Sequence, residues 1–180
     1  MINIITKKIK GFTFLELLIV IGLVAILAGV VIVAVNPAKQ FGKANDSERK
    51  SELGAILEAV YKYQTSPTAR GSFPKGYING VLSDIPDCGT NYAGALELGT
   101  PVDTKHIDLS DMLIPSYLQE FPSDPSKGHD SASTGYWICQ NTEASGVNRV
   151  YVIAGGAEID VNDGGCTVPG TTNPAMCVSE

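Results

Sequence analysis

The chain opens with a short polar segment that is followed by a long run of apolar residues. Residues 12–35 form 24 consecutive positions that carry one charged side chain, Glu16. A helix rises about 1.5 Å per residue, so a run of this length crosses a hydrocarbon core of about 30 Å. The pattern therefore predicts a transmembrane helix over 12–35.

Residues 36–64 show a different, amphipathic pattern. Apolar side chains recur at helical spacing, while the charged side chains, among them Asp46 and Arg49, fall mostly off this stripe. The pattern predicts a helix over 36–64 whose apolar face packs on a globular head. The apolar stripe consists of Leu53, Ile56, Leu57, Val60 and Tyr61.

The junction between the two predicted helices contains Pro37. Proline lacks a backbone donor and disfavours a helical conformation at the preceding residue, here Asn36. We therefore expect a bend or local unwinding between Val35 and Lys43.

The remaining residues, 65–180, alternate short apolar runs with Gly, Pro and Asn, which is typical of a small sheet with loops. A short helical segment broken by Pro115 is expected over 111–120. Strands are expected over 135–140, over 148–154, and over 157–161 after a turn at Gly155 and Gly156. The sequence thus predicts an α+β fold in which the amphipathic half of a long N-terminal helix packs on an antiparallel sheet.

Composition excludes several classes of protein and one class of partner. The 180 residues are 44% hydrophobic and 18% charged, which excludes collagen-like, coiled-coil-only and wholly disordered chains. The formal net charge of -6 repels phosphate backbones, which argues against binding nucleic acid by bulk electrostatics.

The leader, residues 1–11, contains three lysines and no acidic residue. Positive charge before an apolar run places the N-terminus in the cytoplasm, so residues 36–180 are expected on the other side of the membrane. A secretory signal would have a shorter apolar core that ends in a small-residue cleavage site, which this run lacks. The simplest interpretation is a signal anchor.

Glu16 is the feature that a plain anchor does not explain. An ionised carboxylate within the bilayer costs at least about 2.5 kcal/mol unless it is paired, and no Lys, Arg or His lies between Phe12 and Ala38. If the chain were cut after Gly11, the new α-amine of Phe12 would lie at a depth close to that of Glu16 on a neighbouring copy. An intermolecular salt bridge of this kind would offset much of the desolvation and fix the register between subunits.

The residues around this site resemble the class III signal of type IV pilins and of the related pseudopilins of type II secretion. The resemblance is carried by a basic leader followed by Lys10-Gly11-Phe12-Thr13-Phe14-Leu15-Glu16 and an unbroken apolar run. It implies that a prepilin peptidase cuts between Gly11 and Phe12 and methylates the Phe12 amine. It also implies that Glu16 and Thr13 act in assembly and that the fold is type IV pilin-like.

The resemblance leads us to expect a structural subunit of a type IV pilus-like filament. The precursor would sit in the inner membrane with its head outside the cytoplasm, and would polymerise through its N-terminal helix into a cell-surface or periplasmic filament. The implied partners are further copies or other pilins, the prepilin peptidase, and an inner-membrane assembly platform with its ATPase. Two alternatives stay open: a pseudopilin of a type II secretion pseudopilus, and a non-assembling, membrane-tethered extracytoplasmic binding protein.

The four cysteines all follow the apolar run, in the part expected outside the cytoplasm. An even number of cysteines in an oxidising compartment favours disulfides, and three pairings are possible. Cys166 and Cys177 would close a short loop and leave Cys88 to pair with Cys139, which is the pairing we prefer. Free thiols are the alternative in a reducing envelope.

No motif points to an enzyme. His106 and His129 are the only histidines, and nothing orders them with a serine into a nucleophile motif. We expect both to be exposed side chains in loops, and we expect no catalytic residues and no organic cofactor.

Calcium is the one metal that the sequence suggests. Glu158, Asp160 and Asn162 would share one face of a strand and lead into Asp163, which would give a set of hard oxygen ligands. A solvated acidic hairpin is the alternative interpretation. Asp124 and Asp130, in an earlier loop, form a weaker candidate pair.

Overall fold

The computed structural model describes residues 11–126, 128–142, 148–157 and 175–179. The chain divides into two compact units, Met1–Gln40 and Phe41–Glu180. The first unit holds one long apolar helix, and the second holds the sheet and most of a second helix.

Helix α1 spans Phe14–Val35 and helix α2 spans Pro37–Gln64. Between them, Asn36 takes a left-handed conformation with φ of 45°, which ends α1. Pro37 then occupies the first turn of α2, where its missing N–H would have had no partner in any case. The expected local unwinding is therefore confined to Asn36.

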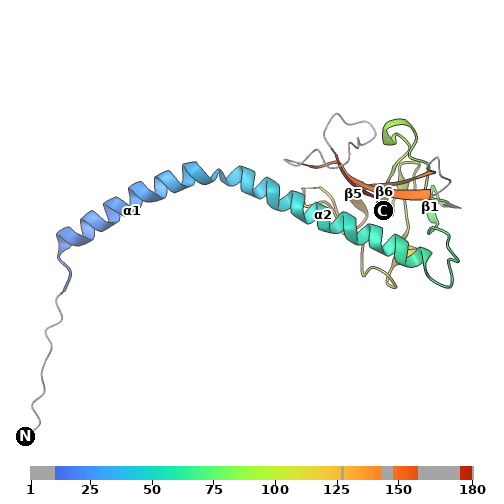
Figure 1. Ribbon diagram of the computed structural model, residues 1–180, viewed down its shortest axis with the longest axis horizontal. Helices are drawn as coiled ribbons and strands as arrows, with labels where there is room; N and C mark the ends of the chain where they lie inside the picture. The colour runs from blue at the N-terminus through green and yellow to red at the C-terminus, as the bar shows by residue number, and fades with distance from the viewer. Residues whose placement is uncertain (1–10, 127, 143–147, 158–174, 180) are drawn as a thin grey trace, which may run out of the picture. The chain divides into compact units, whose positions relative to one another are not determined.

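The apolar stripe of α2 forms one side of the core of the second unit. Leu53, Ile56 and Val60 are completely buried and Leu57 is 4% exposed, whereas Tyr61 packs at the edge of the cluster. Figure 1 shows α2 running along β5 and β6. The helix packs against Leu98, Ile107, Tyr136, Ile138, Val150 and Val152 of the sheet.

The main sheet has five strands in the order β4-β3-β5-β6-β7. All neighbouring pairs are antiparallel except β3 and β4, which are parallel. These strands are β3 (Leu96–Gly99), β4 (His106–Ile107), β5 (Ser133–Thr142), β6 (Asn148–Ala154) and β7 (Met176–Ser179). A separate two-stranded antiparallel sheet joins β1 (Gly76–Ile78) to β2 (Val81–Ser83), and the short helical elements are η1 (Thr90–Tyr92) and α3 (Ser110–Leu113).

The α+β fold and two of the predicted strands are confirmed, since β5 and β6 contain the ranges 135–140 and 148–154. The helix expected over 111–120 is wrong in length. Helix α3 stops at Leu113 because Ile114, which precedes Pro115, is extended with ψ of 138°. Ala157 follows a turn and lies outside any strand, and positions 158–161 of the third expected strand lie outside the described residues.

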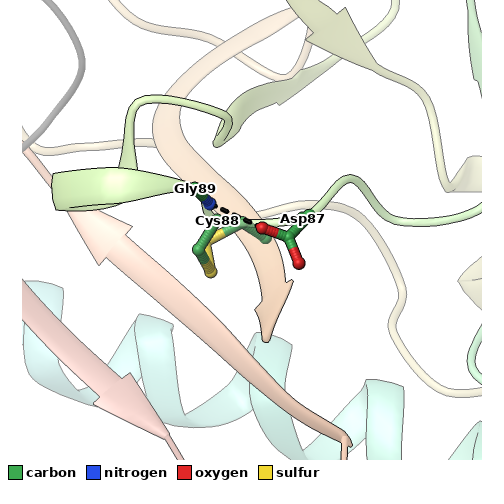
Figure 2. Close-up of a disulfide and its surroundings, with 4 residues drawn as sticks. Asp87, Cys88 and Gly89 are labelled. Carbon is green, nitrogen blue, oxygen red and sulfur yellow. Dashed lines mark hydrogen bonds between the residues drawn. A yellow bond between two sulfur atoms is a disulfide. The ribbon is translucent and has the colours of Figure 1, made fainter. Parts of the chain in front are cut away.

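A disulfide joins Cys88, in the loop before η1, to Cys139 on β5. Both cysteines are buried, in a small cluster on the face of the sheet opposite α2. The Gly89 amide donates a hydrogen bond to Asp87 Oδ1 at 2.8 Å beside the disulfide, as Figure 2 shows. The sequence predicted this pairing, and the structure contains it.

Loss of this disulfide is expected to lower the free energy of unfolding of the head by about 4 kcal/mol. The two cysteines are 51 residues apart, so the bond restricts a long loop of the unfolded chain. The measurement is guanidinium unfolding of the full chain in detergent, comparing the native protein with the double variant Cys88→Ser/Cys139→Ser. A midpoint that does not move would show that the disulfide adds nothing to stability.

Candidate functional site

The N-terminal end of α1 is organised by a reciprocal pair of hydrogen bonds between Thr13 and Glu16. The Thr13 amide and the Thr13 hydroxyl both donate to Glu16 Oε2 at 2.9 Å. In return, the Glu16 amide donates to Thr13 Oγ1 at 3.2 Å. This arrangement is a capping box, and it fixes the first turn of α1 directly after Phe12.

The capping box supplies donors to the Glu16 carboxylate but no opposite charge. Gly11 and Phe12 precede the helix and are exposed, Phe12 with 89% of its surface. The α-amine that cleavage after Gly11 would create therefore belongs to an accessible residue. The intermolecular pair between this amine and Glu16 stays a prediction.

Sequence reasoning placed Thr13 at this site only by resemblance and missed its capping role. The signal was present, because Thr13 and Glu16 stand three residues apart before an apolar run, as in a capping box. A local pattern of this kind can be found without any structure.

The rest of α1 offers an exposed apolar surface. The segment Phe14–Ile32 is long and apolar enough to cross a membrane, with a mean hydropathy of 3.0, and none of it is buried within the described part of the chain. An apolar helix with this much exposed surface needs lipid or other helices around it.

A second charged arrangement lies in the head, where Arg49 of α2 is completely buried. Its Nε and Nη2 atoms donate to the two carboxylate oxygens of Asp124 at 2.8 and 3.0 Å, and Nη1 donates to Asp46 Oδ1 at 2.9 Å. Nη2 also donates to Ser126 Oγ at 2.7 Å. This network ties α2 to the loop that leads into β5.

The network corrects two expectations from the sequence. Asp46 and Arg49 were expected off the buried stripe, but both are buried because the loop 121–126 covers them and supplies a counter-charge. Asp124 is wrong as a calcium candidate, since Arg49 and Ser126 occupy both of its carboxylate oxygens. Asp130 is exposed and caps its own loop by accepting hydrogen bonds from the amides of residues 132 and 133.

The ionisation of Asp124 reflects these contacts. Burial alone would raise the pKa of the Asp124 carboxyl, but hydrogen bonds from Arg49 and Ser126 together outweigh burial and lower the pKa below its ordinary value. Gly156 packs directly on the pair, because an added Cβ there would lie 2.9 Å from Asp124 Oδ2 and 3.0 Å from Arg49 Nη2. The pair is therefore closed off by the turn after β6.

A polar contact beside this network joins α2 to β5. The buried Tyr136 hydroxyl donates to Glu52 Oε2. Burial raises the pKa of the Glu52 carboxyl, and the hydrogen bond from Tyr136 opposes that rise only in part. This contact holds α2 on β5, and the Arg49 network holds α2 on the loop that precedes β5.

The remaining predicted positions divide into three groups. His129 is exposed as expected, whereas His106 begins β4 with a side chain that is only 13% exposed, so the expectation of two exposed histidines is wrong for His106. Cys177 is disulfide-bonded, and its predicted partner Cys166 lies outside the described residues. Also outside them are the calcium candidates Glu158, Asp160, Asn162 and Asp163.

Among the residues that the structure describes, no group of three or more His, Cys, Asp or Glu side chains could hold a metal ion. The calcium site over residues 158–163 stays a prediction.

Comparison with known proteins identifies the N-terminal segment. A family model described as the prokaryotic N-terminal methylation motif matches residues 6–32. No curated protein and no solved structure matches the chain. The motif is the class III signal peptide of type IV pilins and pseudopilins, so the chain carries the signal that its sequence resembled.

Proposed function

We propose that the protein is a structural subunit of a type IV pilus-like filament, made as a precursor and polymerised through α1. The observation that carries this proposal is the overlap of the methylation motif, residues 6–32, with an exposed apolar helix whose one charged residue is Glu16. Proteins with this motif are structural subunits of pili and pseudopili. In this proposal, cleavage between Gly11 and Phe12 creates the α-amine of Phe12. This amine is methylated and pairs with Glu16 of the next copy.

The charge distribution supports an assembly in which only the helices are buried. The leader carries three of the lysines and no acid, so its removal changes the formal net charge from -6 to -9. Nearly all of this charge lies on the heads, which stay in solvent, while the apolar helices bury one another once they leave the lipid. A repeated head-to-tail contact that does not close on itself produces a helical filament.

The apolar helix α1 and the methylation motif support membrane anchoring of a pilin-type protein. The lysine-rich leader supports an orientation in which the head lies outside the cytoplasm. Pseudopilins of type II secretion begin with the same motif. Deletion of the gene that encodes the protein distinguishes the two filaments. Loss of surface fibres supports a pilus, whereas loss of secreted proteins with intact surface fibres supports a pseudopilus.

The direct test of the proposal is the N-terminal residue of the protein in purified fibres. We expect mass spectrometry to find N-methylated Phe12 as the first residue and no trace of residues 1–11. The variant Gly11→Leu, which puts a bulky side chain at the cleavage point, is expected to keep its leader and stay in the membrane. Fibres built from chains with an intact Met1 would contradict the proposed processing.

A further inference from the structure

The face of the sheet opposite α2 carries a cavity that the assembly site does not use. Along a strand, neighbouring side chains point to opposite faces, so residues next to core positions lie on the outer face. Leu98, Ile107 and Ile138 belong to the core under α2. Their neighbours Glu97, His106 and Trp137 stand side by side on the outer face, with Glu97 in register with both of the others.

These three side chains line a cavity of about 550 Å³. This volume falls within the range of about 300–1,000 Å³ that small-molecule sites occupy. The lining combines one aromatic ring, charged groups of both signs and small apolar side chains. The lining residues are Ala93, Ala95, Leu96, Glu97, Thr104, Lys105, His106 and Trp137.

The carboxylate in the cavity is held in place by the protein. Glu97 Oε1 accepts hydrogen bonds from Ser133 Oγ at 2.6 Å and from the Gly135 amide at 2.9 Å. Its second oxygen, Oε2, lies 3.4 Å from His106 Nε2, and both side chains keep some exposure, 15% and 13%. One oxygen of Glu97 is thus structural and the other faces the cavity.

The imidazole of His106 is held in the same way. Its Nδ1 atom lies 2.8 Å from Asp103 Oδ1. The imidazole therefore stands between two carboxylates, those of Asp103 and Glu97. Glu97 Oε2 is the acceptor that the cavity offers to a ligand that brings hydrogen-bond donors.

The other groups of the cavity favour a ligand that also accepts hydrogen bonds and has a flat apolar face. Trp137 is half-buried, and Lys105 and Thr104 are exposed at the rim. The face of an indole ring is electron-rich and attracts weakly positive C–H groups. The Lys105 ammonium and the Thr104 hydroxyl supply donors.

The rim of the cavity at Ala93 and Ala95 belongs to a tightly constrained loop. Cys88 fixes this loop to β5 through the disulfide. Gly94 lies so close to the Asp87 carbonyl that no Cβ would fit, and Asn91 and Tyr92 both have positive φ, 54° and 58°. Backbone of this kind persists where the surroundings over-determine it, and it is frequent at ligand clamps.

We propose that this cavity binds a single saccharide ring. The C–H face of the ring stacks on the Trp137 indole, one of its hydroxyls donates to Glu97 Oε2, and a ring or hydroxyl oxygen accepts from Lys105. An anionic ligand would meet the carboxylates of Glu97 and Asp103, and a purely apolar ligand would leave the charged groups without water. The proposed site gives the head a binding role of its own, independent of filament assembly.

The chain contains one tryptophan, so its fluorescence reports on the cavity directly. The full chain in a zwitterionic detergent, which has no sugar headgroup, is titrated with two series of oligosaccharides. N-acetylglucosamine oligomers stand for cell-wall and chitin-like glycans, and cello-oligosaccharides stand for β-glucans. We expect one series to change the tryptophan emission saturably at millimolar concentration, and the responding series identifies the source.

Two variants locate the effect, with one matched control. Glu97→Gln keeps an oxygen that can accept hydrogen bonds from Ser133 and Gly135, but it removes the negative charge. Lys105→Ala removes the ammonium group at the exposed rim. We expect each variant to weaken binding about tenfold. Tyr77→Ala removes an exposed aromatic ring of β1 that does not line the cavity, and it is expected to bind like the native protein. The near-UV circular dichroism of each variant checks that the head is folded.

No saturable change with either series would overturn the proposal, as would folded Glu97→Gln and Lys105→Ala proteins that bind as well as the native protein. A loss of affinity in Tyr77→Ala equal to that of the cavity variants would also overturn it. None of these outcomes bears on filament assembly, because the titration uses unassembled protein.

Discussion

Glu16→Ala is expected to leave the protein inserted in the membrane but to reduce its incorporation into filaments at least about 100-fold. In the proposed filament the Glu16 carboxylate pairs with the Phe12 amine of the next copy, and removing one partner of a buried ion pair costs about 3–5 kcal/mol because the other charge is left unpaired. Since about 1.4 kcal/mol corresponds to a factor of ten, loss of the pair removes most assembly. Quantitative blotting of sheared fibres and of washed membranes measures the two pools separately.

A conservative variant separates the charge of Glu16 from its capping role. Glu16→Gln keeps an oxygen that can accept from the Thr13 amide and hydroxyl, as Glu16 Oε2 does, but it carries no charge. We expect Glu16→Gln to be as defective as Glu16→Ala. Native incorporation of the Gln variant would show that the capping box alone matters, and native incorporation of the Ala variant would favour a plain membrane tether.

The long elements of the fold could be predicted because periodic patterns of many residues identify them. Helices α1 and α2 and strands β5 and β6 each span at least seven residues. Strands β1, β2, β3, β4 and β7 have four residues or fewer, which is too short for an alternation of apolar and polar positions to stand out.

Buried polar residues were the main failure of sequence reasoning in the head. Arg49 reads as a surface residue because its own neighbours on α2 are polar, and its burial depends on Asp124, which is 75 residues away along the chain. His106 reads as a loop residue because β4 has only two residues, and its burial depends on the pairing of β4 with β3. A contact between distant segments cannot be read from local periodicity.

The N-terminal motif could be recognised in the sequence for the opposite reason. Gly11, Phe12, Thr13 and Glu16 lie within six consecutive residues, and their relevant geometry is a single helical turn. A functional site formed by one local segment is visible in the sequence, whereas the cavity on the outer face of the sheet draws on residues from 93 to 137.

Arg49→Met is expected to lower the free energy of unfolding by about 3–5 kcal/mol. The substitution preserves much of the side-chain volume but leaves the carboxylates of Asp46 and Asp124 buried, each 4% exposed, without their shared counter-charge. The matched control is Lys62→Met, which breaks the exposed ion pair with Glu58 on the same helix and is expected to cost no more than about 0.5 kcal/mol. Guanidinium unfolding of the full chain in detergent measures both.

The pH dependence of the stability difference between the native protein and Arg49→Met distinguishes a lost charge pair from a packing defect. In the native protein the pKa of Asp124 is lowered, so the pair contributes stability above the ordinary pKa of an aspartate and loses it as the pH falls through the lowered pKa. In Arg49→Met, burial without the guanidinium raises the pKa of the same carboxyl, so protonation relieves the buried charge. The stability gap between the two proteins should therefore narrow as the pH is lowered from neutral toward 4, roughly the unperturbed carboxylate range. A gap that stays constant over this range would mean that Arg49 acts by filling space, because packing alone does not titrate.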